Sequence, residues 1–323
     1  MLPKEVVSST DRLTTAAVRC AWSQWSSIGA STHRGPQLGV HDEIVDVEAL
    51  ILGSLGLSQR EPRLRTLATD WAIANSELLS VARMRGLLQG PFSGNDTNIS
   101  ELADRVVTGK GDTRWRALIS AYGKHEPPVR AVRERALKAV PPRWRDARSL
   151  MLQLRRGFGV GVKPDLISIL IGQRAAWLDV ATLCELSAYS VAGVRRAADE
   201  MANAGMIETS GGHSRAYRAD IAAWQALLPN IKSPIWRRRA DGFGFVLRWQ
   251  RYINERSDSH DSELSLAIHF GARMTEFWRL WLEAGVTQEP VSDDAATAWA
   301  SRAIAIDSLT RWFEDRANYG DEY

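Results

Sequence analysis

The 323-residue sequence predicts a mainly α-helical protein with one short β-hairpin near the middle of the chain. Three observations favour this fold class. Apolar residues recur at three- and four-residue steps, as on the buried face of an amphipathic helix. No run within residues 1–128 reads as a strand long enough for a sheet. The pair Gly211 and Gly212 separates two short strand-like runs, as a hairpin turn requires.

The composition is that of an ordinary globular protein. Hydrophobic residues make up 45% and charged residues 24% of the chain, and its length suggests two or three domains. The two cysteines, Cys20 and Cys184, do not make a disulfide framework, which fits a reducing compartment. The sequence shows no signal-peptide pattern and no apolar run near the length of a membrane span. We therefore expect a cytoplasmic protein without a membrane-spanning segment.

Residues 1–128 are expected to form an N-terminal helical domain. Apolar spacing predicts helices over Asp11–Ser26, 41–57, Arg63–Asn75, Leu78–Leu88 and Ile99–Val107. The side chains that crowd the start of the second helix are His41, Asp42, Glu43, Asp46 and Glu48. Acidic side chains suit the positive end of a helix dipole, whereas the alternative, a metal site, lacks a second group of ligands. The sequence thus predicts no metal and no cofactor.

Positive charge is concentrated in residues 129–163, which we expect to form a basic helical connector. This segment has 10 basic and 2 acidic residues, whereas residues 1–128 have 14 of each. Such an excess supplies the sequence-independent attraction to phosphate that dominates affinity for nucleic acid. Arg155, Arg156 and Lys163 are the predicted DNA contacts of this segment. The alternative interpretation is a solvated basic helix or linker.

Gly157, Gly159 and Gly161 lie in the motif GFGVG, near the end of the basic connector. A phosphate-binding loop should leave a strand and enter a helix. Here a helix follows but no strand precedes, so we interpret the motif as a flexible connection rather than a nucleotide site. Patterns typical of a hydrolase nucleophile, a zinc enzyme or a nucleotidyltransferase are also missing. The sequence predicts a protein that is not an enzyme.

Residues 164–220 carry the pattern with the clearest functional meaning. Two apolar faces at helical spacing are separated by a tight turn at Ser187–Tyr189. The residues on these faces are Leu178, Ala181, Leu183 and Cys184 before the turn, and Val194, Ala198 and Met201 after it. The strand-like runs Met206–Ser210 and Arg215–Arg218 then form the hairpin. The predicted order is helix, turn, helix and β-hairpin.

Two residues mark the ends of the second of these helices. Ser190 stands at its start, where a hydroxyl can accept from the free backbone N–H groups of the first turn. Gly205 stands at its end, because glycine accepts the left-handed conformation of a helix stop.

The segment resembles the winged helix-turn-helix superfamily of bacterial transcription regulators. The residues that carry the resemblance are Cys184, Ser190, Val194, Arg195, Arg196, Met201 and Gly205. One departure is Ala188, at a turn position where the family often has glycine; an alanine strained there costs roughly 1 kcal/mol. The resemblance implies a winged helix-turn-helix at residues 164–220, between two helical domains.

The resemblance also implies how DNA is bound. The second helix enters the major groove, and its outward residues face base edges or phosphates. Ser190, Gly193, Arg195 and Arg196 are the predicted contacts on this helix; the alternative for Gly193 is a loosely selected surface position. At the hairpin tip, the predicted contacts are His213 and Arg215, while Tyr217 is expected to pack beneath the hairpin.

Residues 221–323 are expected to form a C-terminal helical domain rich in tryptophan. Large aromatic residues at helical spacing are typical of a core rather than of a partner surface. Helices over Asp261–Ala284 and Asp294–Asp315 are expected to close the domain. Arg237, Arg238 and Arg239 form either a second phosphate-binding patch or a solvated turn.

Together these observations predict a sequence-specific regulator that binds double-stranded DNA as a homodimer and acts as a repressor. Its helical domains would dimerise or bind a protein partner. The alternative is an interaction protein: an antitoxin that represses its own operon and binds a nucleotidyltransferase-type toxin. The architecture is loosely similar to that of AbiEi-type antitoxins, which combine those two roles.

Overall fold

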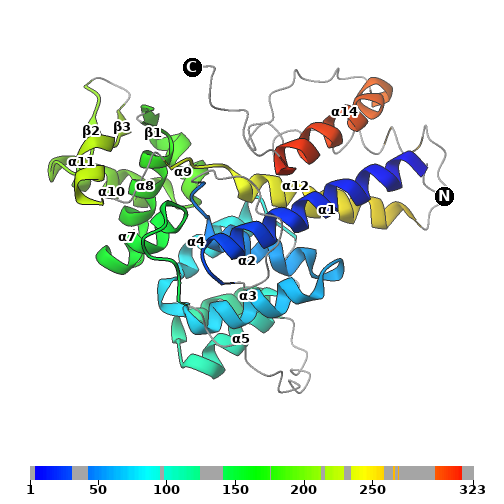
Figure 1. Ribbon diagram of the computed structural model, residues 1–323, viewed down its shortest axis with the longest axis horizontal. Helices are drawn as coiled ribbons and strands as arrows, with labels where there is room; N and C mark the ends of the chain where they lie inside the picture. Colours follow the sequence, from blue (N-terminus) through cyan, green and yellow to red (C-terminus); the bar gives the residue numbers. More distant parts are fainter. Residues whose placement is uncertain are drawn as a thin grey trace.

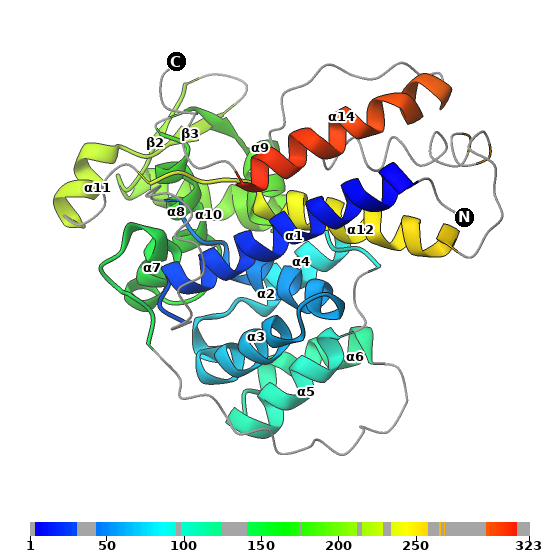
Figure 2. The ribbon, with the colours of Figure 1, turned by 45° about the vertical axis from the view of Figure 1, so that its right-hand side comes forward.

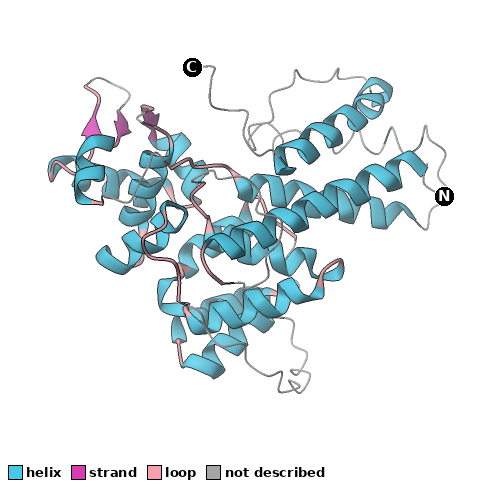
Figure 3. Ribbon diagram, in the orientation of Figure 1, coloured by secondary structure: helices cyan, strands magenta, loops and turns pink. Residues whose placement is uncertain are grey.

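The computed structural model describes residues 4–30, 43–94, 98–123, 141–174, 176–211, 215–228, 234–257, 265, 268 and 295–314. Over these residues the chain is mainly helical, with a small three-stranded antiparallel sheet (Figure 1, Figure 3). This confirms the predicted fold class at that level.

The described helices follow one another from α1 to α14. They are α1 (Lys4–Ser27), α2 (Val47–Gly56), α3 (Pro62–Ala74), α4 (Val81–Gln89), α5 (Ile99–Lys110), α6 (Arg116–Tyr122), α7 (Leu150–Phe158), α8 (Val162–Gly172), α9 (Val180–Ser187), α10 (Val191–Asn203), α11 (Ile221–Leu227), α12 (Arg239–Ser257) and α14 (Ala295–Glu314). The strands are β1 (Leu178–Asp179), β2 (Glu208–Thr209) and β3 (Ala216–Arg218).

Polar side chains determine where several of these helices begin. Asp46 precedes α2, and its carboxylate accepts from the backbone N–H of Ala49 at 3.1 Å. Ser80 does the same for α4 through the N–H of Arg83 at 3.2 Å. Helix α4 therefore starts at Val81, later than expected, because residues 76–78 form a separate 3₁₀ turn.

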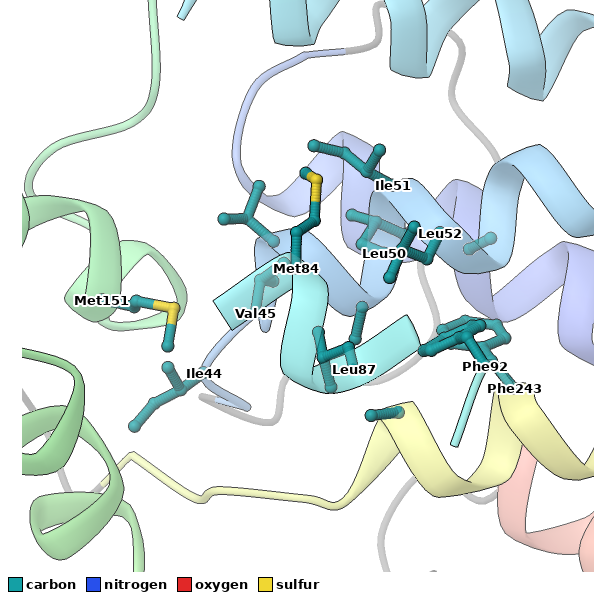
Figure 4. Close-up of a cluster of buried hydrophobic side chains, with 14 of the residues drawn as sticks. Ile44, Val45, Leu50, Ile51, Leu52, Met84, Leu87, Phe92, Met151 and Phe243 are labelled. Carbon is teal, nitrogen blue, oxygen red and sulfur yellow. The ribbon is translucent and has the colours of Figure 1, made fainter. Parts of the chain in front are cut away.

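Helices α1–α6, α12 and α14 pack together, and we call them the helical body. Helix α1 lies against α2, α12 and α14, and α2 also contacts α3, α4 and α12 (Figure 1, Figure 2). Side chains from α2, α4 and α12 meet in one buried cluster (Figure 4). A Cβ on Gly53 of α2 would lie 2.8 Å from the ring of Phe243, so glycine permits this close approach. Helices α12 and α14 thus share one core with the described helices of residues 1–128, whereas residues 221–323 were expected to form a separate domain.

Helices α7–α11 and the three strands form a second group, which we call the central unit (Figure 1). Helix α8 contacts α7, α9 and α10, and the strand order is β1-β3-β2. Leu178 pairs with Tyr217 across β1 and β3. Leu178 therefore belongs to a strand, and the prediction that it lies on the first helix of the pair is wrong. Two residues are too few for a strand pattern to be visible in the sequence.

Backbone hydrogen bonds join the two groups. The N–H of Val45 donates to the carbonyl of Arg148 at 2.9 Å, and the N–H of Trp236 donates to that of Gly172 at 2.9 Å. Tryptophan side chains fill the core as expected: Trp224, Trp236, Trp249 and Trp312 are all buried. The side chains of Trp278, Trp281 and Trp299 lie outside the described residues. None of the described helices is both long and apolar enough to cross a membrane.

Candidate nucleic-acid interface

The turn between α9 and α10 has the geometry that its residues predict. Ser190 is in an extended conformation, and its Oγ accepts from the N–H of Gly193 at 3.3 Å, which confirms Ser190 as the N-cap of α10. Ala188 has φ 56° and ψ 27°, so this alanine adopts the left-handed conformation, as expected for a strained turn residue. Gly205, just after α10, has φ 71° and ends the helix as predicted.

Helix α10 has one buried and one open face. Val194, Ala198 and Met201 are each at most 1% exposed, which confirms the predicted inward side. The exposed residues are Ser190, Val191, Ala192, Arg195, Arg196, Glu200 and Asn203. A Cβ on Gly193 would lie 3.2 Å from Ser190 Oγ, so glycine leaves room for the helix cap. This is a local reason for the glycine that sequence reasoning did not supply.

All seven acidic residues of 164–220 have partners. Asp179 and Asp220 cap helices, and the other acids pair with cations: Asp165 with Arg155, Glu185 with Arg238, Asp199 with Arg215, Glu200 with Lys163 and Glu208 with Arg218. The acidic excess of this segment, counted from the sequence, is therefore compensated locally.

The two cations of α10, both on its open face, stand apart from this pairing. Arg195 and Arg196 are exposed and form no salt bridge with any described residue. The pKa of Asp199 is lowered first by the hydrogen bond from Tyr217, and Arg195 is close enough to add to that shift. The two guanidinium groups of α10 thus remain available to an anion.

The hairpin is attached to α10 through Asp199. Tyr217 is fully buried, as predicted, and its hydroxyl donates to Asp199 Oδ1 at 2.7 Å. Arg215 is exposed and lies 3.0 Å from the same carboxylate, so this arginine, predicted to contact DNA, forms an ion pair with Asp199. The guanidinium of Arg218 stacks 4.5 Å from the ring of Trp177. His213 lies outside the described residues.

The three predicted DNA contacts in the basic connector differ in exposure: one is buried and two reach solvent. Arg155 is 2% exposed, so the prediction that it contacts DNA is wrong: α7 turns this side chain inward. Arg156, the next residue, is exposed and lies 6.0 Å over the ring of Trp144. Lys163 is half-exposed and pairs with Glu200 at 2.8 Å. The basic residues Arg130, Arg133, Arg135 and Lys138 lie outside the described residues.

Arg155 belongs to a set of buried charges that sequence reasoning missed, and we call this set the buried ion cluster. Its members are Arg83, Arg155, Asp46, Glu48 and Asp165. Arg155 donates to Glu48 Oε1 at 2.6 Å and to both oxygens of Asp165 at 2.7 Å, while Arg83 donates to Asp46 Oδ2 at 2.7 Å and to Glu48 Oε2 at 3.0 Å. The cluster joins the helical body to the central unit.

Charge pairing explains why these groups remain ionised inside the protein. Burial raises the pKa of Glu48, but the guanidiniums of Arg155 and Arg83 lower it by more, so the net shift is downward. The same carboxylates hold the pKa of both arginines above the usual range against desolvation. A buried charge without such a partner would be very costly.

A second set of ion pairs accounts for the arginines at the start of α12. Arg239 donates to Glu43 at 2.7 and 2.8 Å and lies 4.2 Å over the ring of Trp312. Arg237 also pairs with Glu43, and Arg238 pairs with Asp241. The three arginines are engaged within the protein, so neither a phosphate patch nor a solvated turn describes them.

The acidic residues near the start of α2 pair with buried arginines of both sets. Glu43, Asp46 and Glu48 are all paired with guanidinium groups, and His41 and Asp42 lie outside the described residues. Among the residues that the structure describes, no group of three or more potential metal ligands is found.

A groove of about 580 Å³ lies beside the α9–α10 turn. Its walls are α4, the turn itself and the start of α12, and its lining includes Arg85, Gly86, Ala188, Ser190 and Arg238. The α9–α10 turn and the helical body therefore meet along this groove, which ends at Ser190, the N-cap of α10.

No protein-family model matches the chain, and comparison with curated proteins and with solved structures finds no match.

Proposed function

We propose that the chain is a sequence-specific double-stranded DNA-binding protein in which residues 164–220 act as a winged helix-turn-helix. Helix α10 would enter the major groove, and Arg195 and Arg196 would contact guanine edges or phosphates. The observation that carries the proposal is the open face of α10, which presents two arginines without salt bridges to described residues above a packed inner face.

The small residues at the start of α10 support the same proposal. Ser190, Ala192 and Gly193 leave the first turn of the helix without a bulky polar side chain, so its backbone can approach a groove closely. Val191 is 52% exposed, and an apolar side chain there suits contact with a thymine methyl group. Beside it, the short hairpin formed by β2 and β3 would act as the wing that touches the backbone.

We further propose that the protein represses transcription as a homodimer. A two-fold dimer would place two copies of α10 in major grooves about 34 Å apart and would favour a palindromic operator. The symmetry of the recovered DNA sequences would report the oligomer directly.

The proposal is tested by selecting DNA fragments with the purified protein and measuring affinity for the enriched sequence at several salt concentrations. We expect Arg195→Ala with Arg196→Ala to weaken binding at least about 10-fold and to reduce the dependence on salt, because each lost phosphate contact lowers the slope by roughly 1. The matched control is Arg19→Ala with Arg116→Ala, which removes the same charge from exposed positions of α1 and α6. Equal affinities for the two double variants would contradict the proposal.

A further inference from the structure

We propose that the helical body sets the orientation of α10 by clamping the α9–α10 turn, with Arg83 of α4 as the positioning residue. The turn clamp consists of Arg83 and Gly86 on α4 and of Ser187, Ala188 and Tyr189 in the turn. The inference concerns the candidate DNA-reading helix and in that respect rests on the proposed function.

Each of the three consecutive turn residues is held from outside the helix pair. Arg83 Nε donates to the carbonyl of Ser187 at 3.0 Å, in a fully buried contact. The hydroxyl of Tyr189 lies 2.8 Å from Ser80 Oγ and 2.8 Å from Asp165 Oδ2. The turn is thus hydrogen-bonded to Arg83 of α4, to Ser80, which is the N-cap of α4, and to Asp165 of α8.

Ala188, between these two anchors, is held by close packing. A Cβ on Gly86 would lie 1.9 Å from the carbonyl oxygen of Ala188 and 2.9 Å from its carbonyl carbon. No side chain fits at Gly86 unless the backbone of the turn moves. Because Ala188 already adopts a left-handed conformation, the turn has little freedom to adjust.

The clamp continues into the helical body through the buried ion cluster. The guanidinium that holds Ser187 also binds Asp46 and Glu48, and Asp46 in turn caps α2. Helix α10 begins two residues after Tyr189, so the direction in which it leaves the turn depends on this chain of contacts. A rearrangement of α2 or α4 would therefore move α10, which gives the helical body a means of controlling DNA binding.

Gly86→Ala tests the clamp, and Gly157→Ala is the matched control. Both glycines lie in helices, but a Cβ at Gly157 would meet nothing within 4 Å. We expect Gly86→Ala to accelerate amide hydrogen exchange at least about 10-fold in residues 187–196, equivalent to roughly 1.4 kcal/mol, while the amides of α3 and α5 keep their protection. Affinity for the selected DNA should fall by a similar factor, whereas Gly157→Ala should change neither quantity.

Two outcomes would overturn the inference: unchanged exchange in residues 187–196, or equal loss of protection throughout the chain, which would indicate a general packing role. If Gly86→Ala does not fold, Tyr189→Phe, which removes only one hydroxyl from the clamp, is measured in the same way. If the unmodified protein binds no DNA, the proposed function fails, while the exchange data still decide whether the turn is clamped.

Discussion

Arg155 and Arg156 are neighbours in the sequence, yet the structure gives them opposite roles. Arg155 donates five hydrogen bonds: two to Glu48, two to Asp165 and one to the carbonyl of Leu78. Replacing it with methionine would leave these acceptors buried, with Asp165 deprived of its cation and Glu48 paired with Arg83 alone. Removing one member of a buried ion pair costs about 3–5 kcal/mol. Arg156→Met, at an exposed position, should cost less than about 1 kcal/mol.

Urea denaturation followed by circular dichroism measures this difference, and acid denaturation adds an independent test. The pKa of Glu48 is lowered in the folded state, so its pairing stabilises the protein above the ordinary value of 4.5 and this stabilisation is lost as the pH falls through the folded value. Without Arg155 the folded pKa of Glu48 moves upward, and acid unfolding should begin at a higher pH. Equal stabilities of the two variants, with DNA affinity reduced only for Arg155→Met, would refute the buried role and restore a phosphate contact.

Three further changes test the local geometry. Ala188→Gly should raise the free energy of unfolding by up to about 1 kcal/mol, because relief of the left-handed conformation outweighs the added freedom of the unfolded chain; a loss of stability would contradict the strained turn. Gly205→Ala should lower it by about 1 kcal/mol through backbone conformation alone, since a Cβ there meets nothing within 4 Å. Thermal unfolding measures both. Burial raises the pKa of both thiols, that of Cys20 to about 11, but Cys20 is only 3% exposed whereas Cys184 is half-buried, so a thiol reagent near neutral pH should modify Cys184 in the native protein and spare Cys20; rapid labelling of Cys20 would show that α1 opens.

Local rules predicted the features of the candidate interface that depend on neighbouring residues. Ser190 caps α10 because of its type and its position before a periodic segment, and Val194 is buried because of its spacing. Gly205 ends the helix because glycine readily adopts the left-handed conformation that follows many helices. These assignments needed no knowledge of tertiary structure. The strain at Ala188 was foreseen from the resemblance, because winged helix-turn-helix proteins often have glycine at that turn position.

Long-range pairing explains the errors. Arg155 meets Glu48 across 107 positions, and Arg239 meets Glu43 across 196, so no spacing in the sequence links the partners. Asp46 caps α2, as its position at the helix start predicted. The second role of Asp46 and Glu48, as counterions for buried arginines, depends on how α4 and α7 lie against α2.

The structure changes which arginines are candidates for contact with nucleic acid. A count along the sequence favours residues 129–163, but among the described residues of that segment Arg155 is buried, and Arg148 and Lys163 are paired with acids. Only Arg143, Arg145 and Arg156, among its described cations, are exposed without a salt bridge to a described residue. In residues 164–220 the acids outnumber the bases, yet every acid is engaged and Arg195 and Arg196 form no salt bridge with a described residue. What attracts an anion is the charge left over after internal pairing, at a position that the anion can reach. On that criterion α10, which is neutral by residue count, is a candidate surface beside the exposed arginines of the connector, and the clamped turn before it determines where its charge points.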